Sequence, residues 1–487
     1  MSTKTRKTCR ALLLALSGLM LLGSAAEPAW AGERQDGYNY SAWGKAVPAP
    51  AAYEASSLVN GGEAGGAAFK EPSDLQAAQG GKVYVLDSGN NRIVVLDADF
   101  KPIRTIEGFE REGQKETFDN PQGFYVSESG EIFVADTGHA RVVHLDEDGK
   151  LVKIVEKPKS ELLAADFAFK PLKVVADRSG RVYVMAEGVF DGFMEFGSDG
   201  VFTSFIGANR VEVDPAEYLW KRLATREQRS RMVMFTPTEF TGFDIDGEGF
   251  IYAASASRNG QPIKKLNAQG ADILRRGGYY RPQGDLLYDN AKGPSRLIDI
   301  DVGDSDMYSV LDAKTGRVFT YNGDGYLLYV FGELGNRIGQ FDTPIAIERV
   351  GDRMLVLDRA LGEITVFGET EYGRTLNEAT RSYYAGDEER AAELFERTAS
   401  LNANLDYAYA GIGKALLRQD DYKQSAEYFK RSMDREGYSK AFLLHRKELM
   451  REYFSWIMSG LVLAAIAFVV TRAVRRRKGR AVYARIK

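Results

Sequence analysis

The sequence predicts an all-β six-bladed propeller, followed by a small all-α domain and one transmembrane helix. Three observations support this: a repeated hairpin pattern in the middle of the chain, two similar segments offset by 34 residues after it, and an uncharged apolar run near the C-terminus. The predicted boundaries are 52–368 for the propeller, 372–452 for the α-helical domain and 453–471 for the membrane span.

Six segments share an apolar run, a turn rich in Gly, Asn or Asp, and a second alternating run, which is typical of a β-hairpin. They begin at Val83, Ile132, Val182, Ile251, Met307 and Met354. Their starts lie 49, 50, 69, 56 and 47 residues apart, a period typical of propeller blades. A stretch after each hairpin supplies a further strand, so we expect six blades of four strands around an axis.

The start and the end of this repeated region complement each other. Blade six ends at Phe367 and is followed by a segment of helical character, so it lacks an outer strand. The segment AYEASSLVNG, which begins at Ala52, has no other partner. We therefore expect this N-terminal strand to close the ring, because closure removes exposed sheet edges.

The blades resemble the NHL-repeat family of propellers, which show an F-x-x-P motif and then an apolar strand with V-x-D-x-x-N-x-R. The residues that carry the resemblance are Asp87 with Arg92, Asp136 with Arg141, Asp312 with Arg317, and Asp358, with Glu363 where Arg is expected. The resemblance implies a six-bladed propeller fold. The chain also resembles the gluconolactonase-like superfamily, which includes lactonases and lyases. We interpret the repeated Asp/Arg pairs as structural ion pairs and turn caps.

Both ends of the chain indicate export and anchoring. Four basic residues, an apolar run and Ala29-Trp30-Ala31 predict a signal peptide over 1–31, followed by a linker over 32–51. The only cysteine, Cys9, lies in the signal peptide, so the exported part has no disulfide or Cys-ligated metal. Residues 453–471 are long enough to cross a bilayer, and the basic tail 472–487 is expected in the cytoplasm.

The charge distribution excludes one class of partner. The chain has a net charge of −4 overall, but the signal peptide and the tail hold an excess of cations, which leaves about −15 on the exterior part. An acidic exterior domain repels phosphates, so we expect no nucleic-acid partner.

Residues 372–452 are interpreted as a helical stalk. Ala392 aligns with Ala426, and Phe395 aligns with Phe429, both at an offset of 34 residues. This is the period of tetratricopeptide repeats. The stalk is interpreted either as a rigid spacer or as a peptide-binding groove.

The candidate ligand site combines two connections between blades. The long connection after blade three predicts a helical insert over 214–232, since Asp214-Pro215 is an N-cap followed by proline. Such connections lie at the same end of a propeller as the turns between second and third strands, so a mouth is expected there. The candidate residues are Tyr218, Trp220, Arg222, Arg226, Tyr279, Tyr280, Arg281 and Tyr288. Aromatic and arginine side chains favour protein or carbohydrate binding, and buried packing is the alternative.

The sequence does not indicate a catalytic residue, a cofactor or a metal ligand set. His139, His144 and His445 lie at positions that do not predict a shared site. The turns DIDGEG at Asp244 and DVGDSD at Asp301 lack the EF-hand spacing and are interpreted as ordinary acidic turns. The sequence neither indicates nor excludes an oxygen-ligated calcium site on the axis.

Two functions follow as hypotheses. The first is a membrane-anchored extracytoplasmic binding or scaffold protein. Its resemblance to exported propellers with a helical stalk and one span implies an accessory sensor of an ABC-type carbohydrate transporter. The second is a metal-dependent lactonase or lyase that acts on the propeller axis. The absence of a recognisable catalytic set favours the first.

Overall fold

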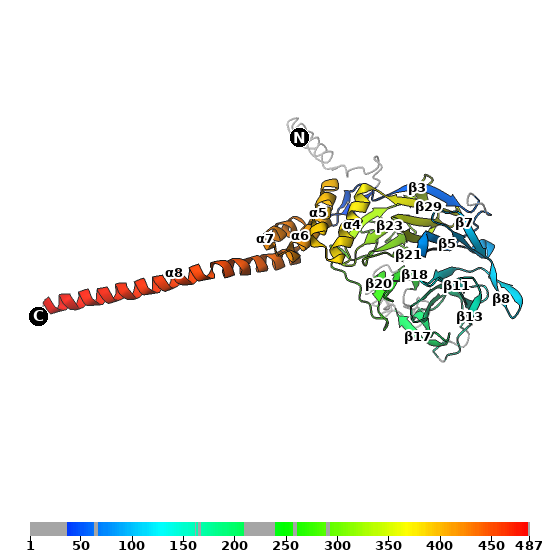
Figure 1. The fold of residues 1–487 in the computed structure, drawn as a ribbon, viewed down its shortest axis with the longest axis horizontal. Coiled ribbons are helices and arrows are strands. Elements are labelled where there is room, and N and C mark those ends of the chain that lie inside the picture. The colour runs from blue at the N-terminus through cyan, green and yellow to red at the C-terminus, as the bar shows by residue number, and fades with distance from the viewer. Residues whose placement is uncertain are drawn as a thin grey trace, which may run out of the picture. The chain divides into compact units, whose positions relative to one another are not determined.

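The structure is a computed structural model that describes residues 37–62, 67–160, 162–163, 167–208, 239–256, 261–288 and 293–485. The predicted signal peptide (1–31) and the helical insert (214–232) lie outside these residues. The described chain forms a six-bladed propeller and an all-α C-terminal region (Figure 1).

Each blade is an antiparallel sheet whose strands follow one another from the axis outwards. Blade one contains β4 (Asp74–Ala78), β5 (Lys82–Asp87), β6 (Arg92–Leu96) and β7 (Pro102–Ile106). Blade two contains β10 (Gly123–Val126), β11 (Ile132–Asp136), β12 (Arg141–Leu145) and β13 (Leu151–Val155). Blade three contains β14 (Pro171–Ala176), β15 (Val182–Ala186), β16 (Gly192–Phe196) and β17 (Phe202–Gly207).

The other three blades follow the same plan. Blade four contains β18 (Phe240–Ile245), β19 (Ile251–Ser255) and β20 (Ile263–Leu266). Blade five contains β21 (Leu297–Val302), β22 (Tyr308–Asp312), β23 (Arg317–Tyr321) and β24 (Leu327–Phe331). Blade six contains β27 (Pro344–Val350), β28 (Arg353–Asp358), β29 (Glu363–Glu369) and β3 (Tyr53–Asn60). Short ladders join β8 (Gly108–Arg111) to β9 (Gln114–Thr117) and β25 (Glu333–Leu334) to β26 (Gln340–Phe341).

Blade four departs from the predicted four strands, since three are present among the described residues. The Arg276 guanidinium occupies the outer edge of this blade. It donates to the Ile263 carbonyl of β20 (3.0 Å) and forms an ion pair with Asp272 (2.7 Å). A side chain therefore satisfies a carbonyl that a fourth strand would otherwise pair.

The second strand of each blade is buried on both faces because it lies between two neighbouring blades. Every residue of β11, β15, β19 and β22 is buried. This explains why these strands are apolar runs without alternation. The outer strand β7, by contrast, is mostly exposed.

The N-terminal strand closes the ring, as predicted. β3 pairs with β29 in an antiparallel register from Tyr53↔Glu369 to Asn60↔Glu363. Blade six is thus built from both ends of the propeller sequence, and its two outer strands seal the ring.

The linker predicted over 32–51 is wrong for its described part. β1 (Tyr38–Tyr40) and β2 (Ala46–Pro48) form a hairpin. Asn39 is buried and donates to the Leu328 carbonyl of blade five (2.9 Å), and the Tyr40 hydroxyl bonds Asp285. The apolar and aromatic content of this segment gives it a docking surface that a flexible linker lacks.

The C-terminal region contains five helices among the described residues. They are α4 (Glu371–Ala385), α5 (Glu388–Leu401), α6 (Asp406–Arg418), α7 (Tyr422–Arg431) and α8 (Arg435–Arg485). The side chains of Thr370, Asp387 and Asp421 cap the first, second and fourth of these. Phe395 and Phe429, the aligned aromatic residues, are both fully buried between helices.

The helical region is not a free-standing stalk, because α4 and α6 pack on the propeller. One apolar cluster contains residues of blades five and six together with residues of α4, α5 and α6. Polar contacts join the same parts: Asn322 donates to the Tyr407 hydroxyl (2.8 Å), and the Tyr329 hydroxyl donates to Asn377 (3.0 Å). The sequence pattern showed the helices but not the partner of their apolar faces.

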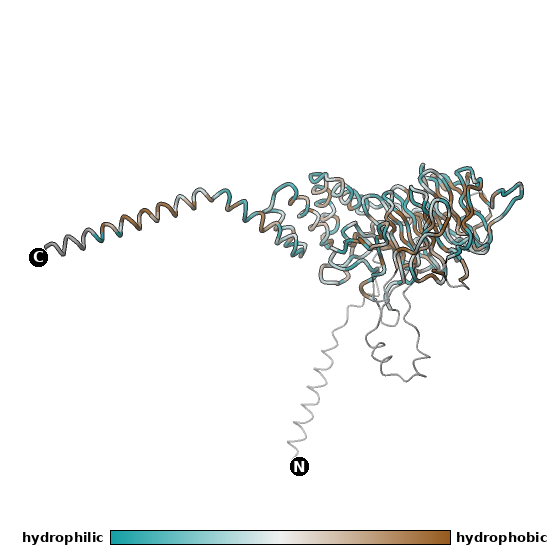
Figure 2. Tube along the Cα trace, turned by 90° about the horizontal axis from the view of Figure 1, so that it is seen from below, coloured by the Kyte–Doolittle hydropathy of each residue, from teal (hydrophilic) through white to brown (hydrophobic). Residues whose placement is uncertain are grey.

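The helix α8 contains the predicted membrane span. Residues 453–471 are all exposed in the described chain, and this helix is long and apolar enough to cross a membrane. Figure 2 shows the continuous apolar stretch along it. Exposed leucine, isoleucine and valine side chains at this density are typical of a helix surrounded by lipid.

Candidate functional site

The described candidate residues of the blade four–five connection lie where this connection meets other parts of the chain. The Tyr279 hydroxyl donates to the Ser432 carbonyl (2.6 Å), and the Tyr280 hydroxyl donates to the Ser41 carbonyl (3.1 Å). With Arg281 they border a cavity of about 30 Å³, which has room for about one water molecule. Tyr288 is exposed. Tyr218, Trp220, Arg222 and Arg226 lie outside the described residues.

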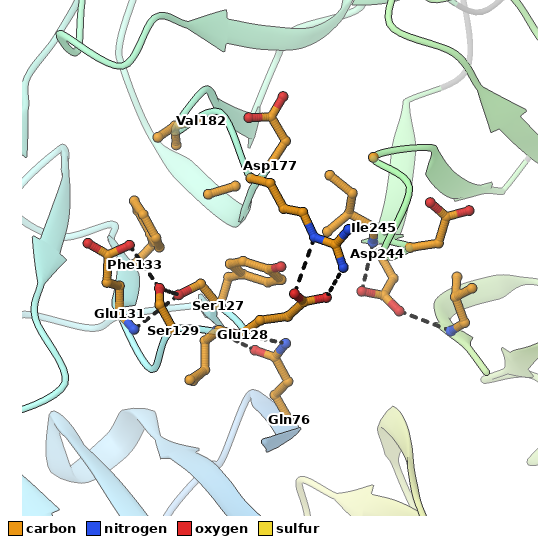
Figure 3. A pocket seen from close by; sticks show the side chains of 18 of the residues that line it. Gln76, Ser127, Glu128, Ser129, Glu131, Phe133, Asp177, Val182, Asp244 and Ile245 are labelled. Carbon is orange, nitrogen blue, oxygen red and sulfur yellow. Dashed lines mark hydrogen bonds and ion pairs between the residues drawn. The ribbon is translucent and has the colours of Figure 1, made fainter. Parts of the chain in front are cut away.

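A much larger pocket, of about 1370 Å³, opens at the other end of the propeller. Its mouth is lined by turns that join first to second strands, such as 127–131, 177–181 and 246–249. In an antiparallel blade these turns lie opposite the turns between second and third strands, where the mouth was expected. Figure 3 shows Gln76, Glu128 and Asp244, from three different blades, gathered around this pocket.

Two ion pairs lie at the mouth, and one of them links neighbouring turns. Arg178 of blade three donates to both carboxylate oxygens of Glu128 of blade two (2.7 and 3.2 Å; Figure 3). Arg181 forms an ion pair with Asp177 (2.7 Å). Because the Arg178 and Glu128 side chains are well exposed, this pair contributes little to stability.

The innermost strands of the six blades contribute two rings of residues to the axis. The register with the second strands defines them. The first ring, which we call the plug layer, consists of Asp74, Gly123, Lys173, Gly242, Asp299 and Ala346. The second ring lies two residues further along and is called the floor layer: Gln76, Tyr125, Val175, Asp244, Asp301 and Glu348.

Lys173 is the centre of the plug layer. Its ammonium group lies 2.6 Å from Asp299 and 3.3 Å from Asp74, so it joins blades one, three and five across the axis. Burial alone would lower the pKa of Lys173, but the two carboxylates outweigh burial and hold that pKa above its ordinary value. Glycine is required beside this group: a Cβ on Gly123 would lie 2.4 Å from the Leu172 carbonyl oxygen.

Carboxylates in both rings accept hydrogen bonds from the neighbouring innermost strand. Each innermost strand is a sheet edge with N–H groups that lack strand partners. Asp244 accepts from Val302 N–H (2.9 Å; Figure 3), Asp301 from Arg349 N–H (3.2 Å) and Glu348 from Ala77 N–H (3.0 Å). Similar bonds run from Phe124 N–H to Asp74 (3.3 Å) and from Ile347 N–H to Asp299 (2.9 Å). These side chains therefore hold adjacent blades together.

The floor layer holds three neighbouring carboxyl groups whose pKa values are all raised. Burial, then the neighbouring Asp301 carboxylate, raises the pKa of Asp244 to about 7. Burial raises the pKa of Asp301 to about 6, although Arg349 opposes it, and burial with both Asp residues raises the pKa of Glu348 well above its ordinary value. Among the described residues, no Lys or Arg side chain is within ion-pair distance of Asp244, Asp301 or Glu348.

One floor oxygen has no hydrogen-bond partner. Asp301 is 3% exposed and lines the pocket, and its Oδ1 accepts the Arg349 bond described above. Its Oδ2 is buried and makes no hydrogen bond with the described residues. A buried carboxylate oxygen without a donor is unfavourable, and a donor entering from the pocket would satisfy it.

The geometry does not gather a metal ligand set. No group of three or more His, Cys, Asp or Glu among the described residues is placed to hold a metal ion. Each of the three histidines contacts a different residue. His139 bonds Asp136 (2.9 Å), His144 stacks on Phe133 with ring centroids 4.1 Å apart, and His445 lies near Glu448 (3.8 Å).

The repeated Asp residues have the structural role predicted for them. Asp87 accepts from Lys70 N–H (2.7 Å) and pairs with Arg92 (2.7 Å). Asp136 pairs with Arg141 in the same way (2.8 Å). Asp312 departs from the pattern, because Arg317 pairs instead with Asp285 (2.9 Å).

Sequence reasoning missed Lys173, Asp299 and Glu348, and it assigned Asp244 and Asp301 to turns. The signal was present in the register of the innermost strands: the two rings appear when each strand is aligned on the second strand of its blade. The first two residues of DIDGEG and of DVGDSD are then strand residues, and the turns begin at the third.

The comparisons with known proteins agree with the fold. The NHL repeat family matches residues 69–96 and 118–145, so blades one and two contain NHL repeats. No curated protein matches the sequence significantly.

Similar solved structures include a virginiamycin B lyase from Staphylococcus aureus (11% identity, TM-score 0.41), which covers 65% of this chain and 100% of that one. A streptogramin B lyase structure (13%, TM-score 0.38) covers 70% of this chain and 100% of that one. A Bacteroides thetaiotaomicron protein of unknown function (11%, TM-score 0.41) covers 68% of this chain and 75% of that one.

Proposed function

We propose that this chain is a membrane-anchored binding protein, held at the outer face of the membrane by α8, whose propeller binds its ligand in the axial pocket. The observation that carries the proposal is the pocket itself: a cavity of about 1370 Å³ with a mouth of paired charges and a floor of partly satisfied carboxylates. Concave pockets with a few convergent polar groups are typical of ligand sites, and this one exceeds the volume of about 300–1000 Å³ that is usual for small molecules.

The proposed orientation places the propeller outside the cell and the basic tail inside. The span 453–471 is followed by eight Lys or Arg residues and no acid, and positive flanks remain in the cytoplasm. The orientation also agrees with the signal peptide that the sequence predicts.

Cysteine labelling tests this orientation. Since Cys9 is the only cysteine, a Cys9→Ala background allows single-cysteine variants, Ser198→Cys beside the pocket and Lys487→Cys in the tail. In intact cells, a membrane-impermeant maleimide should label the first variant, and it should label the second only after lysis. Labelling in the opposite pattern would show that the orientation is wrong.

The finer proposal is that the protein is an accessory component of an ABC-type carbohydrate transporter, with a protein or carbohydrate partner. It rests on the family resemblance and on the anchor, which keeps the propeller close to membrane proteins. Cross-linking followed by purification of the full chain from solubilised membranes tests it. Recovery of the chain without any transporter subunit would count against it.

Two tryptophan variants test whether such a partner binds in the pocket. Ser129 lines the pocket and is exposed, so Ser129→Trp should obstruct the mouth and abolish co-purification. Ser57 is exposed on β3, the outermost strand of blade six, and Ser57→Trp serves as the matched control. Retention of the partner by both variants would show that binding occurs elsewhere.

The second hypothesis, a metal-dependent lactonase or lyase on the axis, gains no support from the described geometry. The carboxylates of the floor layer bond neighbouring backbone N–H groups and do not converge as a ligand set. We therefore propose binding in preference to catalysis.

A further inference from the structure

The two rings of the axis suggest what the pocket binds. The pocket is lined by nine Asp or Glu side chains and by four Lys or Arg side chains. Two of the four cations pair with carboxylates, Arg178 with Glu128 and Arg181 with Asp177. The other two donate to neutral groups, Arg349 to the Tyr53 hydroxyl (2.9 Å) and Lys153 to the Ser198 carbonyl. Acidic side chains therefore outnumber basic ones in the pocket lining by nine to four.

The unbalanced carboxylates lie at two depths. Glu248 and Asp304 line the mouth, and no ion pair engages either of them among the described residues. Asp244, Asp301 and Glu348 form the floor. Acidic groups along a cleft attract cations electrostatically and focus the field at its base.

The hydrogen bonds of the floor layer indicate which chemical group the ligand presents. Glu348 and Asp301 each commit one oxygen to a neighbouring blade, at 3.0 and 3.2 Å. The second oxygen of Asp301 is buried and has no partner. It requires a hydrogen-bond donor, and a donor that carries positive charge would satisfy both the oxygen and the local charge.

From these observations, and resting on the proposed function, we infer that the axial pocket binds an organic cation whose ammonium or guanidinium group donates to Asp301 Oδ2, with the Asp244 and Glu348 carboxyl groups in the same layer. A bare metal ion fits less well, because no three acidic side chains are placed to ligate one among the described residues and the cavity is far larger than an ion. A neutral sugar supplies donors but leaves the excess charge unbalanced.

The inference also gives the acidic floor a role beyond holding the blades together. An amide could accept the same backbone bond, as Gln76 does at the equivalent position in blade one, where it accepts from Val126 N–H (2.6 Å). Blades four, five and six have carboxylates at this register instead, which adds charge without adding an inter-blade bond.

Paired probes that differ in charge but little in shape test the inference. The full chain in detergent is titrated by calorimetry at pH 7.5 with cadaverine and 1,5-pentanediol, with glucosamine and glucose, and with calcium chloride. We expect at least one amine to bind at least about tenfold more tightly than its neutral counterpart, since a charged hydrogen bond contributes about 1.5–3 kcal/mol.

Isosteric variants locate the binding. Asp301→Asn and Glu348→Gln keep the oxygen that accepts the backbone bond and remove the charge, so each should weaken amine binding about tenfold or more. Glu54→Gln removes the same charge from the exposed outer strand β3 and should leave binding unchanged. A cooperative denaturation transition with a midpoint no lower than that of the unaltered chain would show that each variant remains folded.

The outcomes separate the inference from the proposed function. Binding of glucose or pentanediol as tight as that of the amines overturns the organic cation but leaves the pocket as a ligand site. Binding of calcium alone overturns it in favour of an inorganic ion. Failure of every probe to bind, or amine binding that Asp301→Asn and Glu348→Gln leave intact, overturns the inference.

Discussion

The plug layer and the floor layer lie next to each other on the same six strands, yet their charges are arranged differently. In the plug layer, Lys173 lies between Asp74 and Asp299, and each carboxylate also accepts a backbone bond. In the floor layer, Asp301 and Glu348 have the backbone bonds but no cation of the described chain within ion-pair distance. The buried Oδ2 of Asp301 makes no hydrogen bond with the described residues, whereas both plug-layer carboxylates contact Lys173. The residues that stabilise the axis and the residues proposed to bind a ligand therefore lie only two positions apart along the innermost strands.

The largest expected effect comes from breaking the complete ring. Lys173→Met leaves Asp74 and Asp299 buried without a cation, and loss of one partner of a buried ion pair costs about 3–5 kcal/mol. Urea denaturation of the full chain in detergent measures it. The triple variant with Asp74→Asn and Asp299→Asn should recover much of the loss, and equal instability of both variants would show that packing of Lys173 dominates.

A stabilising effect is expected from neutralising the floor. Asp301→Asn keeps the oxygen that accepts from Arg349 N–H and removes a charge that burial disfavours, so at pH 8 it should raise the free energy of unfolding by about 1–2 kcal/mol. The charged groups around this carboxylate are Asp244, Asp299, Asp304, Glu348 and Arg349.

The sign of this effect with pH follows from the raised pKa of Asp301. Its folded pKa is about 6 and its ordinary value is 3.8, so the ionised form destabilises the fold. The penalty is absent below pH 3.8, grows between pH 4 and 6, and persists above that. The advantage of Asp301→Asn should thus be full at pH 8 and small at pH 4.5. An equal advantage at both values would exclude charge as its cause.

A smaller effect of opposite sign is expected from extending the floor. Gln76→Glu places a fourth carboxylate at the same register and keeps the acceptor for Val126 N–H. At pH 8 it should lower the free energy of unfolding by about 1 kcal/mol and strengthen the binding of cadaverine. Denaturation and calorimetry on the same preparation would show both changes, and a gain in stability would contradict the contrast between the two rings.

The smallest effect is expected at the mouth. Glu128→Gln breaks the ion pair with Arg178, but both side chains are well exposed. The thermal midpoint of the full chain should not change measurably. A clear loss of stability would mean that the mouth, and not only the axis, holds blades two and three together.

The sequence was sufficient for the parts of the fold that repeat. The hairpins at Val83 and Ile132 carry strong local patterns, and the missing outer strand of blade six identified β3 as its partner by elimination. The segment around Tyr40 was mistaken for a linker because its partner, Asp285, is about 245 residues away. The packing of Tyr407 against blade five was missed for the same reason.

The candidate site was harder to predict because its residues come from different blades, and no single segment of the sequence contains them. Asp244 and Asp301 stand at the start of acidic stretches that read locally as turns, and Glu348 lies in an ordinary alternating strand. Only the shared register of three blades brings them together. The described pocket also opens at the end opposite the predicted mouth, where no aromatic cluster marked it in the sequence.

The seam in blade six determines when the propeller can close as the chain is synthesised. β3 is synthesised early, but its partner β29 follows about 300 residues later, directly before the C-terminal helices. The bond from Ala77 N–H to Glu348 joins the first blade to the last and also depends on both ends of the propeller sequence. A partly synthesised chain therefore has neither a closed ring nor a complete floor layer, and the axial pocket can form only after blade six has been made.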